Sequence, residues 1–182
     1  MKRLLPIAGL CLAALIQACG DDQTRVPPQP VDGNTVPTMI TDSVNSFVSD
    51  SGITRYHMVA PVWLMFDNAD DPNWKFPDGL YLERFDDDMN VTATVVCDSA
   101  LYLTRDKIWR LDGNVRMRNL DGDRFLTNRV YWNQNTHKVY NDTFIHIRRA
   151  DRIIEGHGFI SNEQMTDYTV RRPTGIFPTP NS

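Results

Sequence analysis

The sequence is poor in cysteine and in basic residues. Its 182 residues include three cysteines, and 19 lysines and arginines stand against 23 aspartates and glutamates, for a formal net charge of −4. An acidic chain is repelled by nucleic-acid phosphates, so this balance argues against a nucleic-acid partner. The apolar stretch at residues 4–15 is also shorter than the roughly 20 residues that a helix needs to cross a bilayer. Its length therefore favours a cleaved targeting segment over a permanent transmembrane helix.

Chemical motifs are scarce as well. No paired carboxylates, nucleophile–base set or phosphate-binding loop stands out in the sequence. The four histidines are scattered and lack the close spacing of zinc ligands. The acidic runs at 67–71 and 86–88 lack the regular spacing of a calcium loop, so we interpret them as turns. The sequence thus predicts no enzymatic activity, no cofactor and no metal site.

The N-terminus has the order of a targeting signal. Lys2 and Arg3 precede the apolar stretch, which ends in Ile-Gln-Ala-Cys at residues 16–19. This order resembles a bacterial lipoprotein signal peptide, which implies cleavage before Cys19 and acylation of Cys19. The alternative is an uncleaved signal anchor with an unmodified Cys19. In the lipoprotein interpretation Cys97 is the one remaining thiol, so no intramolecular disulfide is possible, and we expect Cys97 to be a buried apolar residue.

The rest of the chain divides by composition. We predict a signal peptide at 1–18 and a lipidated cysteine with a flexible, proline-rich tether at 19–38. Residues 39–177 suit a single domain with one core. The last residues, 178–182, are expected to be a disordered tail.

The sequence of the predicted domain indicates strands throughout. Apolar and polar residues alternate in several runs, and the clearest run has apolar or small residues at every even position from Tyr56 to Phe66. Turn signals such as Asp112-Gly113 and Asp121-Gly122 separate the runs, and no sustained helical period occurs. The pattern predicts an all-β domain, as an antiparallel sandwich, barrel or jelly roll.

Seven short motifs carry a resemblance that covers about residues 44–177. They lie at 99–102 (SALY), 109–115 (WRLDGNV), 121–127 (DGDRFLT), 130–133 (VYWN), 138–140 (KVY), 156–159 (GHGF) and 174–177 (TGIF). Their order and spacing are similar to those of the LptC/LptA (OstA-like) lipopolysaccharide-transport proteins, and the last two are similar to the LptC branch. The resemblance implies a single antiparallel β-jellyroll that is open along one side.

The resemblance also implies a function. Proteins of this kind accept lipopolysaccharide from an inner-membrane ABC transporter and pass it to an LptA-type periplasmic bridge protein, without catalytic residues. We therefore expect a non-catalytic export component on the periplasmic side of the inner membrane, held there by a lipid anchor. The alternative is a closed β-sandwich lipoprotein that is tethered to the membrane and binds a protein or glycan without carrying lipid.

Two sets of candidate site residues follow. The apolar strand face supplies the residues that would line a lipid groove or, equally, a dry core: Met58, Val62, Leu64, Phe66, Tyr102, Met117, Leu126, Val130, Trp132, Ile145 and Ile147. An open jellyroll also leaves two edge strands that could pair with partner proteins. The edge candidates are Val44, Ser46, Val48, Tyr168, Val170 and Arg172. Pro173 is expected to end the late edge strand. We interpret the basic pairs Arg148-Arg149 and Arg171-Arg172 as solubilising residues of exposed strands.

Overall fold

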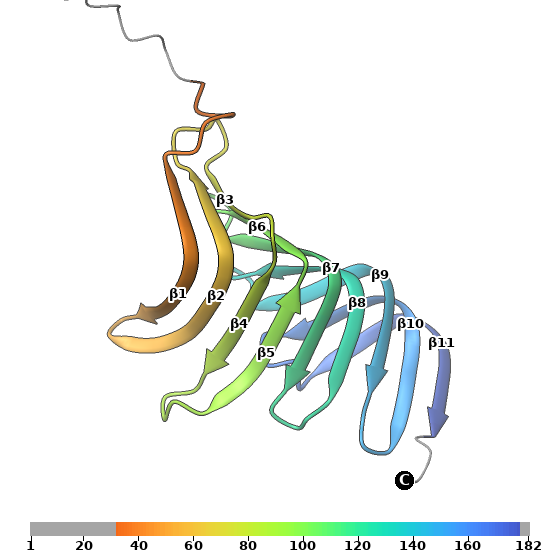
Figure 1. Cartoon of the computed structure of the whole chain (residues 1–182). Helices are drawn as coiled ribbons and strands as arrows, with labels where there is room; N and C mark the ends of the chain where they lie inside the picture. Colours follow the sequence, from red (N-terminus) through yellow and green to blue (C-terminus); the bar gives the residue numbers. More distant parts are fainter. Residues whose placement is uncertain (1–31, 179–182) are drawn as a thin grey trace, which may run out of the picture. The chain divides into compact units, whose positions relative to one another are not determined.

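The computed structural model describes residues 32–178, which form eleven strands and no helix (Figure 1). The strands are β1 (Met39–Asp50), β2 (Ile53–Phe66), β3 (Asn73–Phe76), β4 (Leu80–Phe85), β5 (Val91–Cys97), β6 (Ser99–Leu103), β7 (Ile108–Asn119), β8 (Arg124–Asn133), β9 (Lys138–Arg148), β10 (Arg152–Asn162) and β11 (Tyr168–Pro178). The all-β prediction is confirmed. The predicted signal peptide, Cys19, the tether up to residue 31 and the tail from 179 lie outside the described residues. Within residues 32–178 no helix is long and apolar enough to cross a membrane.

The eleven strands belong to one antiparallel sheet. Its order is β11-β10-β9-β8-β7-β5-β4-β2-β3-β6, and β1 pairs with β2. Two long strands pair with different neighbours along their two parts. The first part of β2 pairs with β4 and its last part with β3, while the first part of β7 pairs with β6 and its last part with β5. The sheet thus has a β4–β5 half and a β3–β6 half, which face each other and are joined along the long strands.

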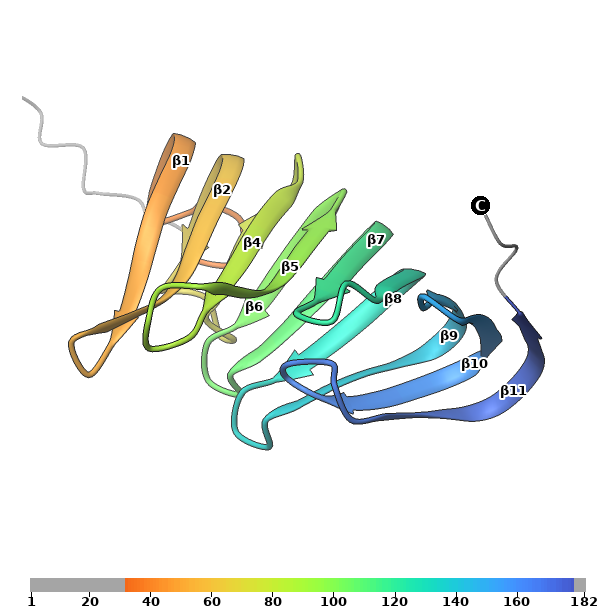
Figure 2. The same cartoon turned by 90° about the horizontal axis from the view of Figure 1, so that it is seen from below.

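The long strands pass from one half to the other through local breaks in register. Shifts occur between Asp112 and Val115 in β7 and between His157 and Phe159 in β10. Gly113 and Gly158 have φ angles of 78° and 80°, a region that glycine adopts without steric cost. Such bulges bend a strand and increase its twist. Figure 2 shows the resulting curvature of β7 to β11.

The core fills the space between the two halves. It consists of apolar side chains from the inner face of nearly every strand, and Phe76, Val115, Phe125, Ile145, Ile147 and Phe159 are completely buried. In β7 the predicted alternation is confirmed, since Trp109, Leu111, Val115 and Met117 are buried. The expected outward positions Arg116, Arg118 and Arg148 are exposed.

The alternation predicted for β2 is wrong at Val62 and Leu64, although Phe66 at the end of the strand is buried. Met58 and Ala60 are buried, but it is Trp63 that packs against the core after the bend, and not Val62 or Leu64. Pro61 interrupts the strand opposite Ser43, whose φ angle is 54°. A proline and a left-handed residue break the regular pleat, so the inner face moves from even to odd positions.

Residues 32–38 belong to the folded unit and not to a tether. The backbone N–H groups of Thr35 and Val36 donate to the carbonyl of Asp32. Asn34 forms two hydrogen bonds with Asp70, which lies in the loop after β2. The side-chain amide of Asn34 donates to the carboxylate of Asp70 at 3.1 Å, and its side-chain oxygen accepts from the backbone N–H of Asp70 at 3.0 Å. The hydrogen-bonded part of the described chain therefore begins before residue 39, where the sequence predicted the start of the domain.

Candidate functional site: the inner face and the two sheet edges

The structure brings most of the predicted groove residues together on the inner face. Six of them are buried in the core, and half-buried Tyr102 packs against it. The six are Met58, Met117, Val130, Trp132, Ile145 and Ile147. They come from β2, β7, β8 and β9, because the bends bring both halves of these strands over one interior.

Four predicted groove residues do not face this interior. Leu126 is 40% exposed, because β8 changes parity at its register shift and Phe125 takes the inner position. Val62 and Leu64 lie beyond the bend at Pro61, outside the core cluster. Phe66 is buried, but its ring lies 4.2 Å from the ammonium of exposed Lys75, again outside the core cluster.

A chain of aromatic rings runs through the interior. Trp63 stacks on Phe76 with ring centroids 5.8 Å apart, Phe76 on Trp109 at 5.6 Å, and Trp109 on Trp132 at 6.4 Å. Tyr56 reaches Trp132 from the opposite half at 5.4 Å. Trp63 and Phe76 are inner residues that the sequence pattern did not predict. Their size was a usable signal, since aromatic side chains bury the largest apolar areas.

Little space remains inside. A pocket of about 40 Å³ lies between residues of both halves, including Leu82, Val95, Met117 and Val130. Ligand pockets usually measure about 300–1,000 Å³, so the interior as described is nearly filled. Its lining is apolar apart from a few groups, among them Tyr56 and Glu163. Burial raises the pKa of Tyr56, and the charge of Glu163 raises it further.

The loop between β10 and β11 closes one side of this pocket. Met165, in this loop, is 2% exposed, lines the pocket and has a φ angle of 56°. Its carbonyl accepts a 2.9 Å hydrogen bond from the side-chain amide of Asn119, at the end of β7. The carboxylate of Glu163 accepts a 2.8 Å hydrogen bond from the indole N–H of Trp132. The Asn119 bond therefore ties the loop to the last residue of β7, and the Trp132 bond ties it to β8.

The predicted edge strands are the two ends of the long row of strands (Figure 2). Among residues 32–178, β1 pairs only with β2, and β11 pairs only with β10. Val44 is buried in the core, Ser46 is half-buried and Val48 is exposed, while Tyr168 and Val170 pack against the core and Arg172 is exposed. Pro173 does not end β11, which continues to Pro178 through a register shift opposite Gly156.

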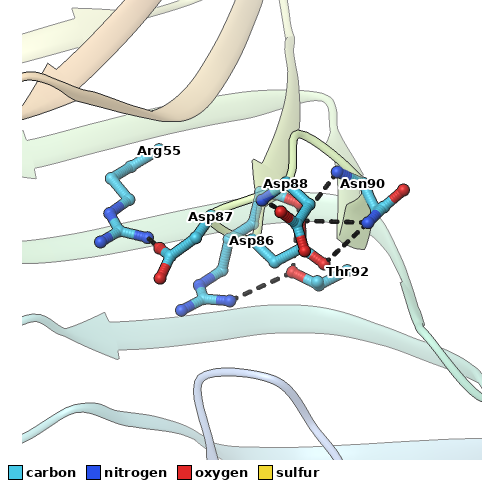
Figure 3. A network of polar contacts seen from close by, with 7 residues as sticks. Arg55, Asp86, Asp87, Asp88, Asn90 and Thr92 are labelled. Atoms are coloured by element: carbon cyan, nitrogen blue, oxygen red, sulfur yellow. Dashed lines mark hydrogen bonds and ion pairs between the residues drawn. The ribbon is translucent and has the colours of Figure 1, made fainter.

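The acidic run at 86–88 forms the predicted turn (Figure 3). A carboxylate oxygen of Asp86 accepts hydrogen bonds from the backbone N–H groups of Asp88 and Asn90, at 3.0 and 2.8 Å. These bonds, led by those from Asn90, lower the pKa of Asp86. Asp87 forms an ion pair with Arg55. In residues 32–178 no three His, Cys, Asp or Glu side chains gather in a way that could hold a metal ion.

A bent antiparallel sheet with an apolar interior and two free edges is a β-jellyroll. The sequence matches the family model for lipopolysaccharide-assembly, LptC-related proteins over residues 4–170, so the chain belongs to the LptC family. It is therefore a component of lipopolysaccharide transport, and proteins of this family lie on the periplasmic side of the inner membrane. A comparison with curated protein sequences gives no significant match.

Proposed function

We propose that this chain accepts lipopolysaccharide from an inner-membrane ABC transporter and passes it to an LptA-type periplasmic bridge protein. The acyl chains would lie between the two halves of the sheet, against Met117, Trp132 and Ile147. The chain itself would supply no chemistry, and the energy would come from the transporter. The observation that carries this proposal is the combination of LptC membership with an apolar interior that extends between two free sheet edges.

Lipid entry requires the interior to widen. A space of about 40 Å³ is far below the roughly 300–1,000 Å³ of ordinary ligand pockets, so an acyl chain does not fit without such widening. The β10–β11 loop is a connecting segment that covers the pocket with the side chain of Met165, so we expect this loop to move first. The small cavity also favours the rival function, a closed sandwich that binds a protein or glycan on its surface.

Photo-crosslinking in cells separates the two functions. A photoreactive amino acid at Met117 or Trp132 should crosslink to lipopolysaccharide. The matched control is Tyr140, a half-buried aromatic residue that stacks on Tyr131 at 5.3 Å and lies outside the core cluster. We expect no crosslink there. Equal labelling at inner and outer sites, or none at either, would defeat the groove proposal.

A second variant tests the loop. Met165→Ala removes the side chain that closes the pocket, so it should increase crosslinking at Met117 if lipid enters there. In a closed sandwich the same change would only create a cavity and lower stability. Unchanged or reduced crosslinking in a folded Met165→Ala protein would count against entry beside this loop.

The free edges are proposed as docking strands, β1 for the transporter and β11 for the bridge protein. The backbone N–H of Asn162 donates to the carbonyl of Asp167 across the start of the β10–β11 pair. N–H directions alternate along a strand and Thr169 lies opposite Ile160, so we expect the N–H of Thr169 to face β10 and that of Val170 to face the free side.

A pair of proline variants tests the late edge. Val170→Pro should weaken capture of the bridge protein while the thermal midpoint changes little. Thr169→Pro is the matched control, because it should break a β10–β11 hydrogen bond and lower stability as well. If Val170→Pro and truncation after Asp167 both leave capture of the bridge protein unchanged, β11 is not the docking strand.

The anchor is proposed to be the acylated Cys19. The family match begins at residue 4, inside the predicted signal peptide, so the uncleaved anchor is the alternative to test. Cys19→Ala should abolish labelling by a fatty-acid probe, whereas Cys97→Ala should not affect labelling. Continued labelling of the Cys19→Ala protein would refute acylation at this site.

A further inference from the structure

Three arginines stand side by side on the outer face of the β4–β5 half. Arg118 of β7 lies directly opposite Arg124 of β8, and Arg124 lies directly opposite Arg148 of β9. All three are exposed. Neighbouring strands are about 5 Å apart, so the row spans about 10 Å. Like charges placed directly opposite each other destabilise a sheet, so the row has a cost that the fold itself does not require.

The row differs from six other arginines of residues 32–178, although Arg84, Arg116, Arg171 and Arg172 likewise form no ion pair there. Six arginines form an ion pair with an aspartate: Arg55, Arg105, Arg110, Arg129, Arg149 and Arg152. Within residues 32–178, Arg118, Arg124 and Arg148 form no such pair. The nearby acids are already engaged, since Asp123 pairs with Arg149, Asp151 with Arg152, and Glu155 with His146. Asp121, in the β7–β8 turn, is exposed and forms no ion pair with the row.

Two further features adjoin the row. A surface hollow of about 260 Å³ lies at its β7 end, lined by Arg118, Thr92, Thr94 and Leu120 among others. Beside the row, Leu126 is 40% exposed and faces Arg116 and His146 across the strands. The surface therefore offers guanidinium donors, a polar hollow and an apolar side chain together.

We propose that Arg118, Arg124 and Arg148 bind the phosphate of an anionic lipid headgroup on the outer face of the sheet. Guanidinium groups donate two parallel hydrogen bonds to phosphate oxygens, and three of them in a row would hold one or two phosphates. Leu126 and the hollow give a lipid more contact than a free phosphate ion receives. The site lies outside the interior groove, so this proposal does not depend on lipid carriage between the two halves.

The test uses the full chain in neutral detergent micelles, which hold the N-terminal apolar segment equally in every variant. Short-chain phosphatidylglycerol, phosphatidylcholine and inorganic pyrophosphate are titrated separately and followed by calorimetry. The test variant is Arg118→Gln/Arg124→Gln/Arg148→Gln. The control, Arg105→Gln/Lys107→Gln/Lys138→Gln, removes the same charge from exposed residues in other turns and strand ends.

We expect phosphatidylglycerol to bind and phosphatidylcholine not to bind. The test variant should bind phosphatidylglycerol about a hundredfold more weakly, at about fivefold per arginine near an anionic surface, and the control should bind like the unmodified chain. Binding should weaken as salt rises. The thermal midpoint of the test variant should be equal or higher, because like-charge repulsion is removed.

Other outcomes would overturn the proposal. Equal weakening in the control would mean that net charge acts without a site. Pyrophosphate binding as tight as that of phosphatidylglycerol would assign the row to free phosphate instead of lipid. A test variant that unfolds, together with an Arg→Lys triple variant that folds and still does not bind, would assign the arginines to the fold.

Discussion

The inner and outer faces of the same strands are held by different forces. On the inner face of β7, β8 and β9 the side chains are apolar and almost completely buried, with a residual space of about 40 Å³. On the outer face the same strands carry arginines, ion pairs and stacked tyrosines in contact with water. Contacts between apolar groups depend little on pH or salt, whereas exposed ion pairs contribute about 0–1 kcal/mol each and are screened. Changes on the two faces should therefore differ in both size and pH dependence.

The largest difference should come from removing one ring on each face. Phe125 is completely buried, so Phe125→Ala should lower the free energy of unfolding by about 3–5 kcal/mol. Tyr140→Ala on the outer face should cost about 1 kcal/mol, the value of an exposed aromatic pair. Urea unfolding measures both. Similar losses for the two variants would mean that the interior is loosely packed and already accessible.

A smaller effect is expected at Gly156 of β10, where β10 packs closely against β11. A Cβ atom at Gly156 would lie 2.5 Å from Cγ1 of Val170 and 2.6 Å from the carbonyl oxygen of Arg172. Gly156→Ala should therefore push β11 away and cost about 1–3 kcal/mol. Hydrogen exchange should localise the loss to β10 and β11. Unchanged exchange in both strands would show that β11 adapts without loosening.

On the outer face a pH-dependent effect of about 1 kcal/mol is expected from Tyr81→Phe. The hydroxyl of Tyr81 donates to Glu83 at 2.6 Å, and His57 contacts the other carboxylate oxygen at 2.8 Å. The Tyr81 bond, followed by the His57 bond, lowers the pKa of Glu83 from its usual 4.5. This contribution to stability is present above about pH 4.5 and is lost as the pH falls through the lowered pKa. The difference between the variant and the unmodified chain should thus shrink in acid, as followed by urea unfolding at several pH values.

The smallest effect is expected at Cys97, which is buried as predicted. Burial raises the pKa of its thiol from 9.0 to about 12. A raised pKa stabilises the folded state below about pH 9, and this contribution is lost as the pH rises toward 12. Cys97→Ala should cost less than about 1 kcal/mol at pH 7 and make unfolding less sensitive to alkali. Rapid alkylation of Cys97 in the folded protein at pH 8 would contradict its burial.

The predicted inner positions agree with the observed burial where a strand keeps one parity, and they disagree where the parity changes. In β7 and β9 the inner residues Met117, Ile145 and Ile147 follow the alternation through the whole strand. In β8 the register shift moves the inner position from Leu126 to Phe125. A bulge adds one residue to one strand only, and alternation in a single sequence carries no record of that addition.

The sequence indicated which strands lie at the two edges of the sheet, but not where the late edge strand ends. β1 and β11 are the free edges, as expected from the resemblance, yet β11 passes through Pro173. A proline is tolerated in an edge strand beside a bulge, and the register of the β10–β11 pair shifts next to Pro173. The closing loop was missed altogether. Nothing in the residues 162–167 indicates that Met165 folds back into the interior.

The sequence by itself determined that the chain is all-β, that Cys97 is buried and that the family is LptC, because alternation, turn residues and ordered motifs are local properties of the chain. Only the tertiary structure decided which face of each half-strand is inside, that the interior is nearly filled, and that three arginines meet on one outer row. These features depend on register between strands that are distant in sequence. Register is set by many weak contacts acting together, which no single segment contains.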